Sequence, residues 1–221
     1  MQSWLKRVSG SRESGQAAIA KETPLHAIRY VVLDTELTSL DPRTNRLLSI
    51  GAIGMQGPSI RLGEQFYRVV NPQVSIPAST VVVHKLRSED VAEGDALDRT
   101  MVDLYHFIAG AVLVGHFVEI ELKILNKEMA STGHTLENPA IDTAKVHQWL
   151  LRHGTYSEEL PLELEKLDLA TLAKFYGVKG DDPHHALADA FLTACMWQKM
   201  LAVLPGKGIR TLRKLLRIAG A

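Results

Sequence analysis

Arg29-Tyr-Val-Val-Leu-Asp-Thr-Glu36 is the stretch of sequence that decides the fold. An apolar run from Tyr30 to Leu33 ends abruptly in two acidic residues, which predicts a buried strand with carboxylates at its carboxyl end. Because side chains alternate between the two faces of a strand, Asp34 and Glu36 point to the same side, with Cα atoms roughly 6.5–7 Å apart. Two carboxylates this close raise each other's pKa unless a cation lies between them, and a divalent metal is the obvious candidate. Helix capping or a solvated turn is the alternative explanation, so the motif gains meaning only from further acids elsewhere.

The composition is that of an ordinary globular domain. The 221 residues are 46% hydrophobic and 23% charged, and a chain of this length buries a substantial core. Lysine plus arginine and aspartate plus glutamate number 25 each, so the overall charge neither favours nor excludes a polyanionic partner. The lone cysteine, Cys195, excludes an intrachain disulfide and fits a reducing compartment. No apolar run of about 18 residues and no apolar signal core are found, so we expect a cytoplasmic protein without a membrane partner.

The pattern along the chain predicts an α/β fold. Two further strands, at residues 46–54 and 63–70, are joined by a short link with glycine and proline, which favours an antiparallel meander. Shorter strands are expected at 111–116 and 139–143, where Asp142 is a candidate helix cap. Helices are expected from residue 88 and at 97–108, 118–129, 143–150, 167–176 and 186–204. We therefore predict a mixed sheet, three antiparallel strands followed by alternating helices and strands, with helices on both faces.

The two ends of the chain are predicted to differ from this domain of residues 25–204. Residues 1–24 show little periodicity and are expected to form a flexible or partly helical arm. Residues 205–221 predict a basic amphipathic helix, with Ile209, Leu212 and Leu216 on one stripe and lysines and arginines on another. This helix either contacts nucleic-acid phosphates or packs its leucines and solvates its charges, and the second alternative is slightly favoured.

Acidic and histidine residues recur where two later segments end. The strand predicted at 111–116 leads into a helix whose first turn holds Glu121. The segment at 181–189, Asp-Asp-Pro-His-His-Ala-Leu-Ala-Asp, places two histidines before a helix and an acid in its early turns. Five residues on a helix turn about 140°, so His184 and Asp189 face one site only if His184 lies in the preceding loop. The proline of this segment favours such a loop, because the residue before a proline avoids helical geometry.

In this order the three segments resemble the exonuclease motifs of the DnaQ-like (DEDDh) 3′→5′ exonucleases, the family of the proofreading (epsilon) subunit of bacterial DNA polymerase III. The matching motifs are Asp-Thr-Glu at 34–36, Val-Gly-His-Phe-Val-Glu-Ile-Glu at 114–121 and His-His-Ala-Leu-Ala-Asp at 184–189. The resemblance covers about residues 28–200. It implies a ribonuclease H-like fold, a DnaQ-like exonuclease domain over residues 25–204, and two-metal hydrolysis of terminal phosphodiesters.

Carried over by position, the resemblance implies a catalytic set of four acids and one histidine. Asp34, Glu36, Glu121 and Asp189 would hold two divalent ions, Mg²⁺ or Mn²⁺, since hard cations prefer oxygen ligands. His184 would be the general base, because a histidine near its neutral form at pH 7 can take a proton from the attacking water. The family usually has aspartate where this chain has Glu121, and the extra methylene predicts lower activity or a preference for Mn²⁺. A solvated helix residue is the alternative for Glu121.

The resemblance also implies residues that contact the terminal nucleotide. These are Thr35, Leu37, Thr38, Leu40, His84 and His116. A structural histidine in a loop is the alternative for His84. The chain departs from the family at Leu37-Thr-Ser-Leu40 and at Phe117, where asparagine is frequent, and these changes concern substrate detail rather than the reaction class.

We therefore expect a metal-dependent 3′→5′ exonuclease that releases nucleoside 5′-monophosphates from single-stranded or frayed DNA. RNA, small RNAs in particular, is the alternative substrate. The alternative from another class is a catalytically weak DnaQ-like module that binds nucleic acid or a replication partner, prompted by Glu121. The expected partners are nucleic acid 3′ ends, with a DNA polymerase or another replication or repair protein as a further candidate.

Overall fold

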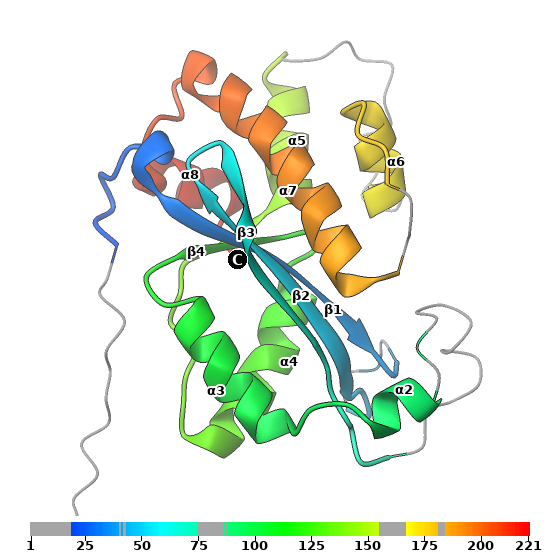
Figure 1. Ribbon diagram of the computed structural model, residues 1–221. Coiled ribbons are helices and arrows are strands. Elements are labelled where there is room, and N and C mark those ends of the chain that lie inside the picture. The colour runs from blue at the N-terminus through cyan, green and yellow to red at the C-terminus, as the bar shows by residue number, and fades with distance from the viewer. Residues whose placement is uncertain are drawn as a thin grey trace, which may run out of the picture.

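A computed structural model describes residues 19–39, 41, 43–74, 86, 88–154, 167–180 and 184–221 (Figure 1). Its centre is a five-stranded sheet in the order β3-β2-β1-β4-β5. The strands are β1 Arg29–Leu37, β2 Leu47–Gln56, β3 Ser59–Val69, β4 Val112–Gly115 and β5 Ala140–Asp142. Strands β1, β2 and β3 form the predicted antiparallel meander, whereas β4 and β5 run parallel to β1.

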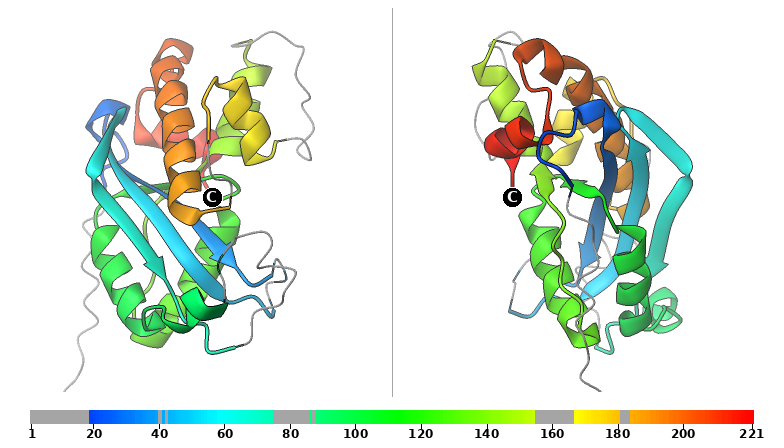
Figure 2. Two further views of the ribbon diagram at one scale, coloured as in Figure 1. Left: turned by 45° about the vertical axis from the view of Figure 1, so that its right-hand side comes forward. Right: turned by 90° about the vertical axis from the view of Figure 1, so that its left-hand side faces the viewer.

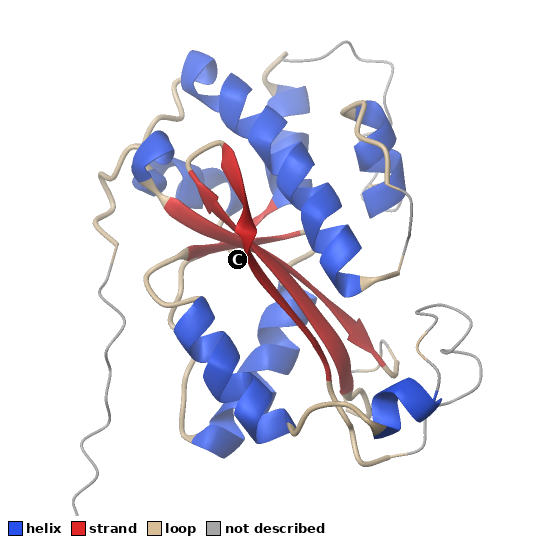
Figure 3. Ribbon diagram, viewed as in Figure 1, coloured by secondary structure: helices blue, strands red, loops and turns tan. Residues whose placement is uncertain are grey.

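Helices cover both faces of this sheet, as predicted (Figures 2 and 3). The α-helices are α2 Ser88–Ala92, α3 Leu97–Phe107, α4 Glu119–Met129, α5 Thr143–Arg152, α6 Leu169–Phe175, α7 Ala186–Val203 and α8 Leu212–Ala219. Three short 3₁₀ turns are described at η1 Leu25–Ala27, η2 Ala130–Thr132 and η4 Leu204–Lys207. Helices α3 and α4 pack on one face, and α5, α6, α7 and α8 pack on the other.

Strand β1 is buried on both faces because it lies in the middle of the sheet. Tyr30 and Val32 contribute to the core under α7, and Val31 and Leu33 contribute to the core under α3 and α4. A strand covered on both sides reads as a continuous apolar run, which explains the opening stretch of the sequence. The same alternation directs Asp34 toward the α7 face at the carboxyl end of the strand.

Helix α7 is the core helix of the domain. It contacts both β1 and β2, and Trp197 packs edge-on against Tyr30 with ring centroids 5.5 Å apart. Among the described residues, Ala186–Lys207 is the one helical stretch that is long and apolar enough to cross a membrane by length and composition. Half of the apolar 18-residue segment within this stretch is, however, buried inside the protein. Its apolar character is accounted for by its contact with the sheet.

The two ends of the described chain lie against each other. The Leu25 backbone N–H donates to the Arg210 carbonyl, and the Leu212 N–H donates to the Thr23 carbonyl. The last residues of the arm predicted at 1–24 are therefore hydrogen-bonded to the tail, whereas residues 1–18 lie outside the described part.

The tail packs its apolar stripe into the core. Leu212, Leu215 and Ala219 are buried, and Leu216 is only partly buried. The apolar stripe therefore includes Leu215 in addition to the residues expected from the sequence. Helix α8 packs its leucines into the core, which was the favoured alternative.

Candidate active site

A glycine on β2 lets helix α7 begin directly on the sheet. Gly51 pairs with Asp34 in the β1–β2 register. A Cβ atom at Gly51 would lie 2.1 Å from the backbone nitrogen of Leu187, a distance that no side chain tolerates. The absence of a side chain therefore brings the first turn of α7, and with it His184 and Asp189, next to the acidic end of β1.

His184 lies outside the helix, as the sequence argument required. Its φ of 65° is left-handed, and the side chain of the next residue, His185, caps α7. The His184 backbone N–H donates to Asp189 Oδ2 at 2.9 Å. Ligand atoms of Glu36, His184 and Asp189 all lie within 4.8 Å of one another. The loop conformation thus overcomes the 140° that would separate the two residues on a regular helix.

The carboxylates of β1 interact with acids from two other segments. Burial raises the pKa of Asp34 well above its usual range, and the charges of Glu121, Asp189 and Glu36 raise it further. Burial and then the charge of Asp189 raise the pKa of Glu36 to about 7. The four acids selected from the sequence are therefore close enough in space to oppose one another's ionisation.

Glu121 is an inward-facing member of this cluster. It lies in the first turn of α4 and is 6% exposed, so it is not a solvated helix residue. Burial, followed by the charges of Asp142 and Glu36, raises the pKa of Glu121 to about 8. Its Oε2 atom is buried and finds no hydrogen-bond partner among the described residues. A buried carboxyl oxygen without a donor is costly, and a bound cation would remove that cost.

The donor set fits divalent metal ions. Glu36 and Asp189 bring carboxylate oxygens close to one nitrogen of His184, and hard cations such as Mg²⁺ and Mn²⁺ take oxygen ligands. Mutual repulsion among the acids and the unpartnered oxygen of Glu121 are both relieved by positive charge. The residues present therefore suit a metal centre.

A fifth acid, Asp142, lies beside this cluster at the end of β5. The sequence predicted it only as a helix cap, and it does cap α5 by accepting the Ala144 N–H at 2.8 Å. It also accepts the N–H of Phe117 at 3.3 Å, and its charge raises the pKa of Glu121. The position of Asp142 beside Glu121 could have been inferred from the parallel pairing of β4 and β5, because parallel strands end at the same edge of a sheet.

Comparison with known proteins agrees with this geometry. A family model described as "Exonuclease" (RNase T) matches residues 31–196, which is most of the chain. The chain belongs to this exonuclease family. All four clustered acids and His184 fall within the matched range, and the chain contains a DnaQ-like exonuclease domain.

Curated relatives of the exonuclease domain are named as DNA polymerase III subunits. An epsilon-like protein of Rhodobacter capsulatus is 31% identical over 198 residues, which cover 89% of this chain and 27% of that protein. The epsilon subunit of Aquifex aeolicus is 26% identical, and the match covers 79% of this chain and 81% of that subunit. The chain spans 27%, 12% and 11% of the lengths of the first three such relatives, so it corresponds to one part of those larger proteins.

Solved structures confirm the ribonuclease H-like fold. Escherichia coli exonuclease I in complex with a dT13 oligonucleotide superposes with a TM-score of 0.71 at 15% identity, covering 82% of this chain and 42% of that one. The cell-death related nuclease CRN-4 gives a TM-score of 0.67 at 16% identity, covering 80% of this chain and 65% of that one.

His116 of the exonuclease domain is partly buried, and both of its ring nitrogens are hydrogen-bonded within the protein. Its Nε2–H donates to the Leu167 carbonyl at 2.6 Å, and its Nδ1 lies 3.0 Å from the hydroxyl of Thr143. Burial lowers the pKa of the ring. In this conformation His116 joins α5 to Leu167, which lies two residues before α6 begins.

The other expected nucleotide contacts fall into three groups. The Thr38 side chain is buried, and its Oγ1 accepts the backbone N–H of Arg46, so this hydroxyl supports the β1–β2 connection. Leu37 packs against the core under α3 and α4, and the Thr35 hydroxyl is buried. Leu40 and His84 lie outside the described residues.

Tyr67 on β3 was not selected from the sequence. Its ring stacks on His185 with centroids 4.7 Å apart and an interplanar angle of 21°. Burial and the nearby charge of Glu36 raise the pKa of Tyr67, which places the phenol next to the acidic cluster. Tyr67 is opposite Gly51 in the β2–β3 register, and this relation appears only when the strands are paired.

Proposed function

We propose that the chain is a metal-dependent 3′→5′ exonuclease of the DEDDh type that removes nucleoside 5′-monophosphates from single-stranded or frayed DNA. The observation that carries this proposal is the group of four acids from three separate segments, in which Glu121 leaves a buried oxygen without a partner. Such a group is unfavourable without positive charge and therefore argues for a catalytic centre rather than a stabilising network.

Asp34, Glu36, Glu121 and Asp189 are the residues that would hold two divalent ions, Mg²⁺ or Mn²⁺. When bound, the ions would stabilise the negative charge of the phosphate and of the attacking and leaving oxygens. Glu121 has one more methylene than the aspartate usual in the family. Because Mg²⁺ demands stricter geometry, we expect Mn²⁺ to support a higher rate.

His184 is proposed as the general base. Its side chain is exposed at the mouth of the site, next to Glu36 and Asp189. The hydrogen bond from its backbone to Asp189 fixes the loop, so the imidazole can accept a proton from a water molecule that approaches the carboxylates.

DNA is the favoured substrate because of the relatives. The curated matches are named as DNA polymerase III subunits, and exonuclease I was crystallised with a DNA oligonucleotide. RNA is the alternative. A polymerase or another replication protein remains the candidate protein partner, and the cytoplasm remains the expected location.

The test is digestion of matched 5′-labelled and 3′-labelled single-stranded DNA and RNA with Mg²⁺ or Mn²⁺. We expect stepwise shortening of 5′-labelled DNA and early release of the label from 3′-labelled DNA, both lost in Asp34→Asn. Glu119→Gln is the matched control, because Glu119 lies in the same turn as Glu121 but is exposed and paired with Lys145.

Glu121→Asp provides the second arm of this test. A higher rate with Mg²⁺ would identify Glu121 as a ligand whose length limits the wild-type enzyme. If neither oligomer is cut with either metal by folded protein, the exonuclease proposal is wrong and a nucleic-acid or partner-binding module takes its place.

A further inference from the structure

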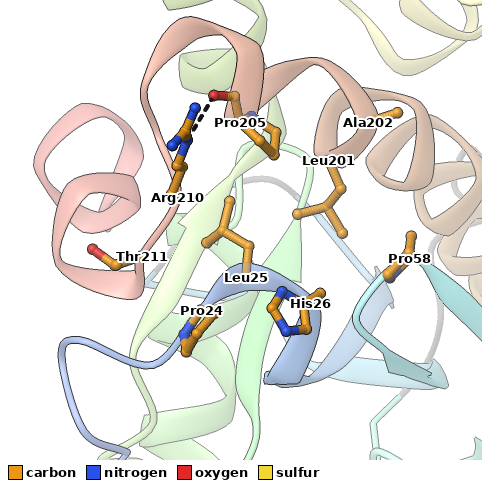
Figure 4. A pocket seen from close by; sticks show the side chains of 9 residues that line it. All are labelled: Pro24, Leu25, His26, Pro58, Leu201, Ala202, Pro205, Arg210 and Thr211. Atoms are coloured by element: carbon orange, nitrogen blue, oxygen red, sulfur yellow. Dashed lines mark hydrogen bonds between the residues drawn. The ribbon is translucent and has the colours of Figure 1, made fainter.

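The exonuclease domain has a pocket beside the last turns of α7, whereas Asp189 lies in the first turn of that helix. Figure 4 shows the residues that line this pocket. This pocket encloses about 440 Å³, a volume within the usual range for ligand sites. Its walls come from η1, the β2–β3 turn, the last turns of α7 and the segment that leads to α8. The lining is mainly apolar and includes Leu25, Pro58, Leu201, Ala202 and Pro205, with the Arg210 side chain at its edge.

The pocket is preformed because each wall is tied to a neighbour. The Gln198 side chain donates to the Pro58 carbonyl at 2.6 Å, which joins the β2–β3 turn to α7. The Leu25 backbone N–H donates to the Arg210 carbonyl at 3.1 Å, and Arg210 Nε donates to the Pro205 carbonyl at 3.2 Å. Prolines in the lining further restrict the backbone. A ligand would therefore enter without first ordering the site.

The segment that follows the pocket residues Leu201 and Ala202 is basic, and Arg210 from this segment is part of the pocket lining. Lys207 and Lys214 donate to backbone carbonyls, which hold the side chains in place but do not neutralise them. Of the five cations in the tail, only Arg213 pairs with a carboxylate, that of Glu22, among the described residues. Arg210 thus lies at the edge of an apolar pocket with no acidic residue in its lining.

We propose that this pocket docks a short segment of a partner protein in which a bulky apolar side chain is flanked by acidic residues. The apolar side chain would fill the space between Leu25, Leu201 and Ala202, and the acids would lie against Arg210. Ala202 is thirteen residues beyond Asp189 on one helix, a separation of roughly 20 Å. A partner bound here leaves the carboxylates open to substrate.

The experiment is selection of random heptapeptides from a display library on the full chain, followed by fluorescence polarisation with the selected peptides. We expect enrichment of leucine, phenylalanine or tryptophan next to aspartate or glutamate. Ala202→Glu places a negative charge in the pocket, and Arg210→Glu reverses the charge at its edge. Both residues are exposed, so both variants should fold. Each should weaken peptide binding at least tenfold.

Ala130→Glu is the matched control, because Ala130 is also an exposed alanine at the carboxyl end of a helix, on the other side of the sheet. It should leave binding unchanged, and all three variants should retain wild-type exonuclease activity. Peptides without acidic or bulky apolar residues, or peptides that bind Ala202→Glu as well as wild type, would overturn the proposal. Concentration-dependent dimerisation that is abolished by Ala202→Glu would also overturn it, because the occupant would then be a second copy of the chain. Loss of oligonucleotide binding in Arg210→Glu would overturn it too, because the positive charge would then serve nucleic-acid binding.

Discussion

Replacing Glu121 by glutamine should stabilise the metal-free protein at alkaline pH. The substitution keeps the size of the side chain and removes one charge from the carboxylate cluster. Glutamate is ordinarily ionised above about pH 4.5, whereas in the folded protein the pKa of Glu121 is raised to about 8. Below pH 4.5 the side chain is protonated in both the folded and unfolded states, so its ionisation does not lower the stability of the folded state. As pH rises from 4.5 to 8, ionisation favours the unfolded state, and above pH 8 the destabilisation is complete.

The size of the effect follows from this pKa. A rise from 4.5 to about 8 corresponds to about 5 kcal/mol, at about 1.4 kcal/mol per pKa unit. The glutamine amide is also buried without an assured partner, so we expect about half of this, roughly 2–3 kcal/mol at pH 8.5. For a chain of this length that corresponds to a melting temperature higher by roughly 5–10 °C.

The assay is urea or thermal denaturation of wild type and Glu121→Gln at pH 4.5 and pH 8.5, with EDTA and with saturating Mn²⁺. With EDTA the variant should be more stable at pH 8.5 but less stable than wild type, by roughly 2 kcal/mol, at pH 4.5, because the cost of the buried amide is the same at both pH values. With Mn²⁺ the wild type should gain more, because metal binding to the native state stabilises it. Glu119→Gln is the control, since the hydrogen bond from Lys145 lowers the pKa of Glu119 and its removal cannot stabilise the fold. A Glu121→Gln variant that is less stable than wild type at pH 8.5 in EDTA, or a difference independent of pH, would refute the reasoning.

Three further predictions concern the elements around the site. His184→Ala should lower the exonuclease rate by about 10²–10⁴ while the Mn²⁺-induced rise in melting temperature persists; loss of that rise would make His184 a metal ligand instead of a base. Gly51→Ala should destabilise the protein by several kcal/mol, because the new Cβ would lie 2.1 Å from Leu187 N, whereas Gly63→Ala, with no heavy atom within 4 Å, should be close to neutral in denaturant titrations. Asp168→Ala removes the cap of α6 and should cost about 1 kcal/mol at pH 7. Since its hydrogen bonds to Thr171 lower the pKa of Asp168, that cost should disappear as pH falls through the lowered pKa, and a constant difference down to pH 2 would contradict the capping role.

The arrangement of secondary structure was accessible from local sequence. The alternation of Tyr30 to Glu36, the glycine and proline in the β2–β3 link and the capping aspartate before α5 each act over a few residues, and each prediction was confirmed. The ends of the domain were less accessible. The hydrogen bonds between residues 23–25 and 210–212 join segments almost the whole chain apart, and no local pattern records them.

The hydrogen-bond partners of two residues expected to contact the nucleotide were likewise not predictable from local sequence. His116 and Thr38 are polar residues next to catalytic motifs, so the sequence suggested contact with a ligand. In the folded chain their polar atoms are taken by Leu167, Thr143 and Arg46, two of which lie far away in the sequence. Hydrogen-bond partners depend on which segments meet, and a motif does not contain that information.

By itself the sequence indicated which acids and which histidine lie together in one cluster, and on what kind of sheet. This is possible because the residue types and their order along the chain match those of the exonuclease family to which the chain belongs. Only the tertiary structure decided how those residues meet. It placed α7 on Gly51, buried Glu121 with an unpartnered oxygen, and brought the charge of Asp142 against it. Each of these depends on distances between segments, and such distances are fixed only when the chain packs.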